Sequence, residues 1–367
     1  MSYELDFIPV GENTKSGDAI LFRFWDDTKG ETEEDQKVCL IDGGYAETGE
    51  SIKKHIDKYY KTSTIDLVIS THPDLDHIGG LSYILENFTV KKLWLHRPWQ
   101  ENLVDGLSDC FKDSRFTDNS VKNKLQEGLN KAYELEQLAI SKNIPVEDPF
   151  TDVTAFNGVI TILSPTEEYY RQLLTEFRCT PDPIVQANES YIAKMAKTIK
   201  KIFETWLTDK LEEEPTTTAE NNSSAVILLK ISSSQYILLT SDAGVPPLSK
   251  VAEKLSEMGI KDKIVYYQIP HHGSKHNVNT NLLNNLIGDI LDEGSTISKG
   301  ACVSVAKNSD YKHPSQAVIN AFVRRGIKPV MTKGKNLCKH SNDIPIREGY
   351  TAAKQLEFCA NYEIEGN

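Results

Sequence analysis

The chain has 367 residues, a length that fits one or two domains. Hydrophobic residues make up 39% of it and charged residues 26%, which excludes a disordered chain and predicts a buried core. The formal net charge of −12 argues against a surface coated with cations for nucleic acid.

Targeting signals and cysteine pairs are missing from the sequence. No apolar run reaches the roughly 18 residues of a membrane helix, and residues 1–10 lack the basic start and apolar stretch of a signal peptide. Six cysteines are scattered without a CxxC pair, so neither disulfides nor a cysteine zinc site is expected. We therefore expect a cytoplasmic protein that has no membrane partner.

The first part of the chain alternates between short β-rich runs and helical segments. The expected strands are 3–10, 19–25, 37–41, 66–70 and 90–95, and the expected helices are 51–60 and 77–87. This βαβ rhythm predicts a sheet with helices packed against it.

The middle of the chain is mainly helical. Helical periodicity covers 98 to about 148, most clearly 121–141, and returns at 167–177 and 189–211 after a strand at 159–163. The polar, proline-interrupted run 212–222 is predicted to be a mobile connection.

The last part returns to alternating strands and helices. Its expected strands are 225–230, 236–239, 264–269, 300–305 and 329–332, and its expected helices are 247–258, 281–291 and 315–325. Two β-rich halves with helices outside predict an α/β fold, an αββα sandwich that carries a helical insertion. The predicted divisions are 1–97 for the first half, 98–220 for the mostly helical insertion with intervening strands, and 221–367 for the second half.

The run HPDLDHIGG, at residues 72–80, is the strongest chemical signal. It follows an apolar strand and contains four side chains of metal-ligand type: His72, Asp74, Asp76 and His77. Gly79 and Gly80 would let the backbone pack closely behind these side chains. Turns and helix caps explain Asp and Pro, but not two histidines interleaved with two aspartates. The run therefore predicts a metal site.

This run resembles the HxHxDH signature of the metallo-β-lactamase superfamily, in the variant found in the hydrolase domain of ComEC-like competence proteins. Further motifs stand in the order of that family: IDGG at 41–44, NNSS at 221–224, LTSD at 239–242, PHHGS at 270–274 and YKHPS at 311–315. The resemblance spans nearly the whole chain except 98–150 and 165–220, and it implies the metallo-β-lactamase sandwich.

The resemblance also implies a ligand set for one or two divalent metal ions. By position, the first ion takes His72 and Asp74, the second takes Asp76, His77 and His271, and Asp242 bridges the two. Asp42 is expected to support the loops rather than to bind metal.

Two departures from the family pattern bear on the metal. Asp74 stands where many members have histidine, and Asn222-Ser223 stands where many have another histidine. Oxygen in place of nitrogen favours Mn²⁺ or Mg²⁺ relative to Zn²⁺, although affinity alone ranks zinc above manganese. Zn²⁺ and Mn²⁺ are the expected cofactors, with Mg²⁺ as a further alternative, and one or two ions stay open.

Three residues are expected to act in catalysis. Asp76 would orient the attacking water, while His272 and His313 would act on the substrate. Ser274, Lys275 and His276 stay open as alternatives to them. The remaining histidines have no expected chemical role: His96 is predicted to pack beside aromatic rings, and His55 and His340 to lie on the surface.

These features predict a metal-dependent hydrolase, with a phosphodiesterase or nuclease that uses a metal-activated water as the first hypothesis. The basic run at 324–340 would position a nucleic-acid backbone, or it is only a solvated helix end. The expected partner is nucleic acid or a small phosphoester. Hydrolysis of a small phosphoester, lactone or thioester, and a non-catalytic binding module with a degenerate metal site, are the alternatives. The helices at 98–148 and 167–211 are expected to cover or flank the active-site face and to select substrates.

Overall fold

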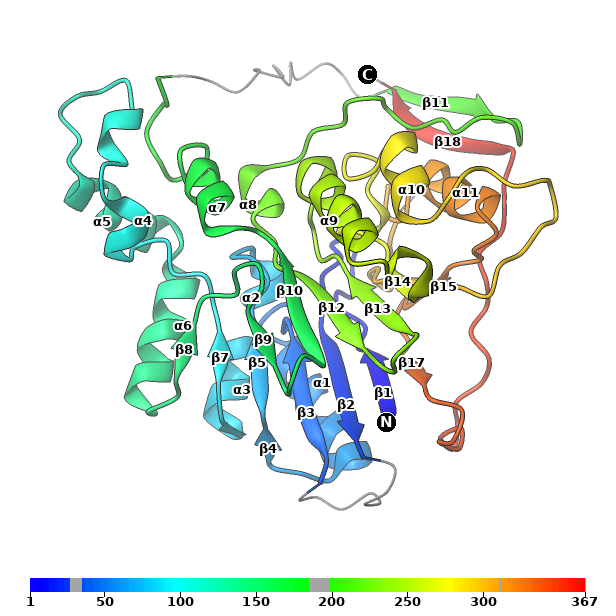
Figure 1. Cartoon of the computed structure of the whole chain (residues 1–367), viewed down its shortest axis with the longest axis horizontal. Helices are drawn as coiled ribbons and strands as arrows, with labels where there is room; N and C mark the ends of the chain where they lie inside the picture. The colour runs from blue at the N-terminus through cyan, green and yellow to red at the C-terminus, as the bar shows by residue number, and fades with distance from the viewer. Residues whose placement is uncertain (27–34, 185–197, 311, 367) are drawn as a thin grey trace.

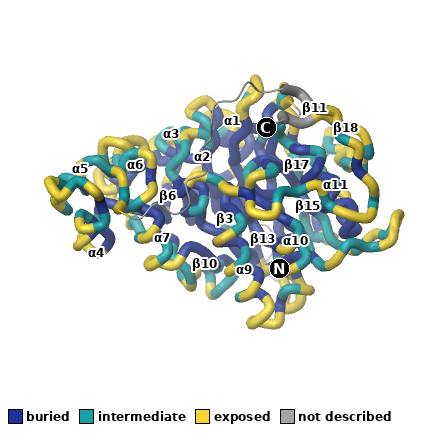
Figure 2. The backbone as a smooth tube through the Cα atoms, turned by 90° about the horizontal axis from the view of Figure 1, so that it is seen from above, coloured by how far each residue is buried: buried dark blue, intermediate teal, exposed yellow. Residues whose placement is uncertain are grey.

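The computed structural model describes residues 1–26, 35–184, 198–310 and 312–366. Within these residues the main elements are two seven-stranded sheets packed face to face with helices on their outer sides (Figure 1). Figure 2 shows the buried strands in the middle, with α1 and α3 on one side and α9 and α10 on the other. This arrangement is the predicted αββα sandwich.

The first sheet has the order β17-β1-β2-β3-β5-β7-β8. Its strands are β1 (Ser2–Phe7), β2 (Ile20–Trp25), β3 (Lys37–Ile41), β5 (Leu67–Ile69), β7 (Leu93–Trp94), β8 (Val146–Glu147) and β17 (Leu337–His340). From β3 to β8 the strands run parallel, and β1 and β2 are antiparallel to their neighbours.

The second sheet has the order β16-β15-β14-β13-β12-β10-β9. Its strands are β9 (Thr154–Ala155), β10 (Ile160–Ser164), β12 (Val226–Lys230), β13 (Tyr236–Leu239), β14 (Ile264–Gln268), β15 (Gly300–Val303) and β16 (Val330–Met331). Strands β13 to β16 are parallel, so their carboxyl ends meet at one edge of the sheet.

Helices flank both sheets, and two small sheets lie beside them. The helices are α1 (Thr48–His55), η1 (Ile56–Tyr60), α2 (Leu75–Ile78), α3 (Leu81–Asn87), α4 (Glu101–Val104), η2 (Ser108–Cys110), α5 (Asp118–Gly128), α6 (Asn130–Ser141), α7 (Glu167–Leu174), α8 (Ala219–Asn222), α9 (Val245–Glu257), η3 (Lys261–Lys263), η4 (His271–Gly273), α10 (Thr280–Leu286) and α11 (Gln316–Arg324). The small sheets pair β4 (Thr64–Ile65) with β6 (Thr89–Val90) and β11 (Thr198–Phe203) with β18 (Asn361–Gly366).

Three apolar clusters form the sandwich core. One lies between the sheets and includes Phe22, Trp94 and Ile227. A second joins the first sheet to α1, α3 and α6, and a third joins the second sheet to α9, α10 and α11. Since every layer buries its apolar face, hydrophobic burial holds the two halves of the chain together.

The inserted segment, residues 98–220, adds a separate helical cluster. Helices α4, α5, α7 and α8 pack around buried apolar side chains such as Leu103, Leu125 and Tyr170 (Figure 1, left). The predicted helix 121–141 is two helices, α5 and α6, that meet at Leu129. The segment also supplies β8 to the first sheet and β9 and β10 to the second.

Two predictions for the end of the inserted segment are corrected. Of the helix predicted at 189–211, residues 189–197 lie outside the described residues, and 198–203 form strand β11. Pairing with β18 outweighs the helical periodicity, because tertiary pairing overrides local propensity. The predicted mobile connection 212–222 ends in helix α8, which Thr218 caps by accepting from the Asn221 backbone N–H.

Long-range contacts also overturn two surface predictions. Arg324 and Arg325 are buried and pair with Asp209, and Arg324 also pairs with Glu204. The basic run at 324–340 therefore keeps only its lysines for a surface patch. His55 is buried rather than exposed, and its Nε2 lies 3.4 Å from Asp6 Oδ2.

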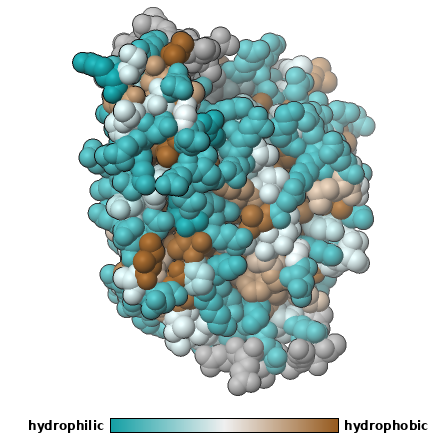
Figure 3. Space-filling view, turned by 60° about the vertical axis from the view of Figure 1, so that its left-hand side comes forward, coloured by the Kyte–Doolittle hydropathy of each residue, from teal (hydrophilic) through white to brown (hydrophobic). Residues whose placement is uncertain are grey.

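Other expectations agree with the structure. Every cysteine is free, and His96 stacks on Tyr170 with ring centroids 4.5 Å apart. None of the described helices combines the length and apolar character needed to cross a membrane. The face in Figure 3 is mostly hydrophilic, with apolar atoms confined to separate patches.

Asp6 is a buried charge that contributes to stability. Its carboxylate accepts hydrogen bonds from Arg347 at 2.7 and 2.9 Å and from the Tyr60 hydroxyl at 2.6 Å. Burial alone would raise the pKa of Asp6, but hydrogen bonding to His55 and the charge of Arg347 lower it to about 2. The ionised Asp6 therefore stabilises the folded protein fully above about pH 4, and this stabilisation is lost as the pH falls through about 2.

We predict that Asp6→Asn lowers the free energy of unfolding by roughly 1–3 kcal/mol at pH 7, because it removes one of the two carboxylates, Asp6 and Glu4, that pair with Arg347. Urea unfolding at several pH values measures the difference between the two proteins. That difference should shrink between pH 4 and pH 2. Asp113→Asn is the control, since Asp113 forms an exposed ion pair with Arg115 that solvent screens. An equal loss in both variants would contradict the prediction.

Candidate metal centre

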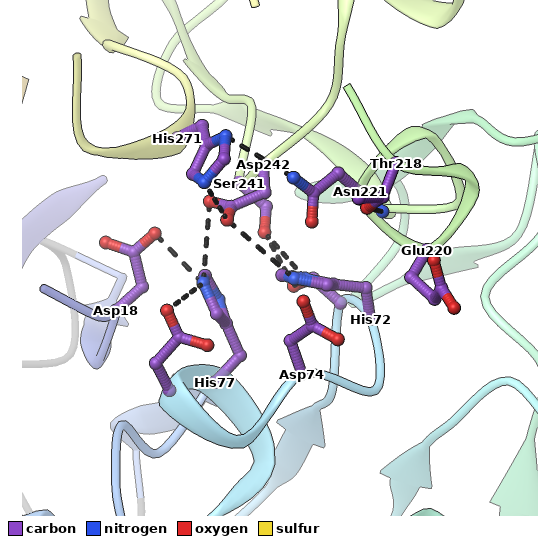
Figure 4. Close-up of polar contacts among 12 residues, drawn as sticks. Asp18, His72, Asp74, His77, Thr218, Glu220, Asn221, Ser241, Asp242 and His271 are labelled. Carbon is purple, nitrogen blue, oxygen red and sulfur yellow. Dashed lines mark hydrogen bonds and ion pairs between the residues drawn. The ribbon is translucent and has the colours of Figure 1, made fainter. Parts of the chain in front are cut away.

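The candidate metal centre lies where loops at the carboxyl ends of strands from both sheets meet (Figure 4). The loop after β5 carries the 72–77 run, and the loops after β13 and β14 carry Asp242, His271 and His272. In open α/β sheets such strand ends are the usual place for a ligand. The two sheets therefore bring distant parts of the sequence into one small volume.

Asp242 is at the centre of this volume. Its Oδ2 lies 3.8 Å from His72 Nε2 and 3.5 Å from His271 Nε2. Its Oδ1 lies 3.4 Å from His77 Nε2 and 3.8 Å from His272 Nε2. Four imidazoles thus surround one buried carboxylate, which is the position that the sequence predicts for the bridging ligand.

Asp76 and Asp18 complete the acidic part of the centre. Asp76 Oδ2 lies 3.6 Å from His272 Nε2 and 3.9 Å from His77 Nε2. Asp18, His77, Asp242 and His272 each offer a ligand atom within 4.8 Å of the others. Asp18, which lies in the turn GDA at 17–19, is a site residue that the sequence analysis missed. His272, predicted to act on substrate, stands among the possible ligands.

Contacts behind the imidazoles fix which nitrogen faces the centre. His77 Nδ1 donates to Asp42 Oδ2 at 2.7 Å, and His272 Nδ1 donates to the Ser304 carbonyl at 3.1 Å. His271 Nδ1 lies 2.8 Å from Asn277 Oδ1. Such outer contacts orient histidine ligands and set their tautomer.

The inward-facing atoms have no hydrogen-bond partner among the described residues. They are Nε2 of His72, His77 and His272, together with Oδ1 of Asp18 and Asp242. Buried polar atoms without a partner are rare and costly, so they indicate a missing ligand. Nitrogen and carboxylate oxygen atoms that converge in this way fit a divalent cation.

The pKa values of the histidines in the metal-free protein also indicate a site for a cation. Burial would lower the pKa of His272, but the charge of Asp242 and the nearby Asp76 carboxylate raise it to about 9. Burial would also lower the pKa of His77, but Asp242 and Asp42 raise it well above its usual value. The carboxylates thus draw positive charge into the centre, and a bound cation would displace these protons.

The backbone of the site loops is strained. Asp42, Ser241, His271 and His272 all have positive φ angles, of 57°, 46°, 46° and 55°. Residues with side chains rarely adopt this region, and such strain concentrates at functional sites. A carbon on Gly80 would lie 2.2 Å from the Gly43 carbonyl oxygen, so the predicted close packing behind the run requires glycine there.

Asp74 and Asn222 lie at the edge of the centre. Asp74 stands beside His72 (Figure 4). Its Oδ1 accepts a hydrogen bond from Arg178 Nη2. Asn222 Oδ1 accepts from the Gly244 backbone, so its side chain holds a loop. Its neighbour Asn221 instead reaches His271, with 3.3 Å between Nδ2 and Nδ1. The first metal position thus has fewer ligand atoms close by than the second.

The other substrate candidates lie at the rim. The His313 ring centroid lies 5.9 Å from that of His271 and 6.4 Å from that of His272. Burial and these two histidines lower the pKa of His313 to about 4, so its imidazole is neutral at pH 7. Lys275 pairs with Glu212 at 3.0 Å.

Comparison with known proteins identifies the fold. Residues 32–156, about a third of the chain, match the model of the metallo-beta-lactamase superfamily. The fold is that of a metallo-β-lactamase. This superfamily consists of metal-dependent hydrolases, and the matched part contains the 72–77 run. Nothing in the comparisons singles out the ComEC-like variant.

Solved structures with this fold are only distantly similar. A protein from Thermotoga maritima described as a metallo-beta-lactamase has 13% identity and a TM-score of 0.36, over 71% of this chain and 93% of its own. An archaeal superfamily protein from Sulfolobus tokodaii has 15% identity and a TM-score of 0.27, over 70% and 77%. No curated protein sequence matches the chain.

We predict that Asp42→Asn weakens binding of the first-bound divalent ion by about 10–100-fold, because it removes the acceptor that orients His77. Titration of the metal-free protein with Zn²⁺ or Mn²⁺ in a calorimeter measures this affinity. Asp66→Asn, in a carboxylate that contacts the backbone of Val38 away from the centre, is the control. Unchanged affinity in Asp42→Asn would remove the supporting role assigned to Asp42.

A second prediction separates the roles of His272 and His313. His272→Ala should reduce the bound metal per protein chain, since its Nε2 faces two carboxylates of the centre, whereas His313→Ala should retain metal and lower turnover. Elemental analysis of the dialysed proteins measures metal content, with His340→Ala as the matched histidine control. Loss of metal in His313→Ala, or full metal in His272→Ala, would reverse these assignments.

Proposed function

We propose that this protein is a metal-dependent phosphodiesterase. The observation that carries the proposal is the set of buried, inward-facing ligand atoms without partners around Asp242. At the first metal position, Asp74 supplies an oxygen ligand where the superfamily pattern usually has a histidine. Oxygen-rich ligation suits the cations used with phosphate esters.

The bound cation and the residues around it would have different roles in hydrolysis. A divalent cation lowers the pKa of water and stabilises negative charge on phosphate oxygens. The Asp76 carboxylate is more exposed than those of Asp18 and Asp242, and interactions with His272 and His77 lower its pKa to about 2 despite burial. It is therefore ionised at pH 7 and can orient water as a hydrogen-bond acceptor. His313, at the rim, is positioned to donate a hydrogen bond to the substrate.

A nuclease is the first specific form of this proposal, and it rests on the chemistry of the centre and on the ComEC-like resemblance. The basic run contributes less than its sequence suggests, because Arg324 and Arg325 are buried. Lys328, Lys333 and Lys335 remain exposed. These three cations offer only a small surface for a nucleic-acid backbone.

A small phosphodiester is the second candidate, and one observation favours it. A cavity of about 320 Å³ lies between the 73–75 loop and the inserted segment. A confined space beside the centre suits a short substrate better than a long duplex.

Asp76→Ala should abolish hydrolysis while leaving the fold intact, with a rate loss of about 10²-fold or more, because it removes both a ligand and the acceptor for water. The assay incubates the pure protein with Mn²⁺, Mg²⁺ or Zn²⁺ and single-stranded DNA, RNA or a chromogenic phosphodiester. Circular dichroism checks the fold of the variant.

Two outcomes would overturn the proposal. Turnover of a lactone or thioester without turnover of any phosphodiester would assign another hydrolase. Metal binding without hydrolysis of any of these substrates would favour the binding module with a degenerate site.

A further inference from the structure

The cavity that favours a small phosphodiester lies beside the metal centre, and none of its lining residues has yet been assigned to substrate binding. Its volume of about 320 Å³ is at the lower end of the range for small-molecule sites. It is lined on one side by the loop that holds Asp74, and on the other by the start of α6 and the segment after α7. The inserted segment therefore forms a wall directly next to the candidate ligands.

Arg178 is the residue that joins this wall to the centre. Its Nη2 donates to Asp74 Oδ1, and its Nε lies 3.0 Å from Glu220 Oε1. The same Glu220 oxygen accepts the Arg178 backbone N–H at 2.7 Å. Glu220 is buried, whereas the Arg178 side chain is 62% exposed. A buried carboxylate thus anchors one edge of an exposed guanidinium.

The remaining donor of Arg178 is available for a ligand. Among the described residues, Nη1 has no hydrogen-bond partner in the contacts of Arg178, which involve Nη2, Nε and the backbone. A guanidinium that is fixed on two edges loses little entropy when it binds an anion with the third. Arginine in such a fork recognises phosphate and carboxylate oxygens.

Close packing of the neighbouring residue Cys179 fixes the position of the Arg178 backbone. A carbon on Gly128 would lie 2.1 Å from Cβ of Cys179, so the Cys179 side chain packs against the Gly128 backbone as only glycine allows. Gly128 ends α5, and Cys179 follows Arg178 directly. The segment that carries Arg178 is therefore locked to the helices of the inserted segment.

The cavity also has apolar surface next to this cation. Pro73, Leu75 and Leu129 contribute to its lining, and Leu75 is 57% exposed. An exposed leucine beside an arginine offers a face for the flat or apolar part of an organic phosphate. The lining thus combines one anion-binding group with one apolar face.

We propose that this cavity is the substrate subsite next to the scissile bond, and that Arg178 binds a second phosphate group of the substrate there. The proposal rests on the proposed function and gives its substrate class: an organic phosphodiester that carries a further phosphate, as at the end of a nucleotide chain. Coordination of a cation by Asp74 would draw charge away from Arg178 and strengthen its attraction for that phosphate.

The test compares thymidine dinucleotides with and without a terminal phosphate at the 5′ or the 3′ end. The wild-type protein should prefer one phosphorylated form by about ten-fold or more in kcat/KM, and Arg178→Gln should reduce this preference to nearly one. All the dinucleotides share the same scissile bond, so any effect of Arg178 on Asp74 and metal cancels in the ratio. Arg178→Lys should keep part of the preference, since it keeps the charge but not the fork.

Two further variants make the result specific. Arg115→Gln is the matched control, because Arg115 is an exposed arginine of the inserted segment that pairs with Asp113, and it should keep the wild-type ratio. Asn130→Trp places an indole in the cavity lining without changing Arg178 or Asp74, and it should raise KM for the preferred dinucleotide several-fold. An unchanged preference in Arg178→Gln, or an unchanged KM in Asn130→Trp, would overturn the proposal.

Failure of the proposed function would be visible separately, as a wild-type protein that cleaves no phosphodiester at all. In that case calorimetric binding of thymidine 5′-phosphate to the metal-free proteins decides the inference. At least ten-fold weaker binding to Arg178→Gln than to the wild-type protein would support the subsite. Equal binding, or none to the wild-type protein, would refute it.

Discussion

The geometry of the site depends on one buried carboxylate, Asp242, which four imidazoles approach within 4 Å. His72 and His77 come from the first sheet, and Asp242 comes from the second. The ligands therefore meet only when the two sheets pack face to face. A buried carboxylate surrounded by unpartnered nitrogen atoms is unfavourable in an empty cavity, and a divalent cation relieves that cost. Hydrophobic burial between the sheets thus brings together ligands from distant parts of the sequence.

Hydrogen bonds around the centre orient the candidate ligands that the two sheets bring together. Asp42 and the Ser304 carbonyl occupy the outer nitrogen atoms of His77 and His272, which leaves each Nε2 directed inward. Positive φ angles at Asp42, His271 and His272 aim these side chains at the cost of backbone strain. The loops are thereby prepared for a cation before one binds, so little reorganisation is needed on binding.

The sequence predicted those parts of the molecule that local patterns encode. The sandwich and the 72–77 run follow from periodicity and from ligand spacing within a few residues. Asp18 lies in a turn whose own sequence gives no sign of its partners. Arg324 and Arg325 look like surface cations until the residues after β11 supply buried carboxylates. Arg178 contacts Asp74 across 104 residues, a pairing that no local pattern contains.

The fold and the inserted segment have different roles in the proposed function. The sandwich supplies the centre around Asp242, and this chemistry is compatible with many substrates on the same fold. The inserted segment supplies Arg178 and Glu220, and Asn221, which directly follows it, contacts a candidate ligand, His271. A substitution in this segment would therefore affect both the selection of substrates and the binding of metal. Asp74 stands where a neutral histidine is usual, and its negative charge gives Arg178 a partner. The same aspartate therefore weakens one metal position and anchors Arg178, the residue proposed to bind the substrate.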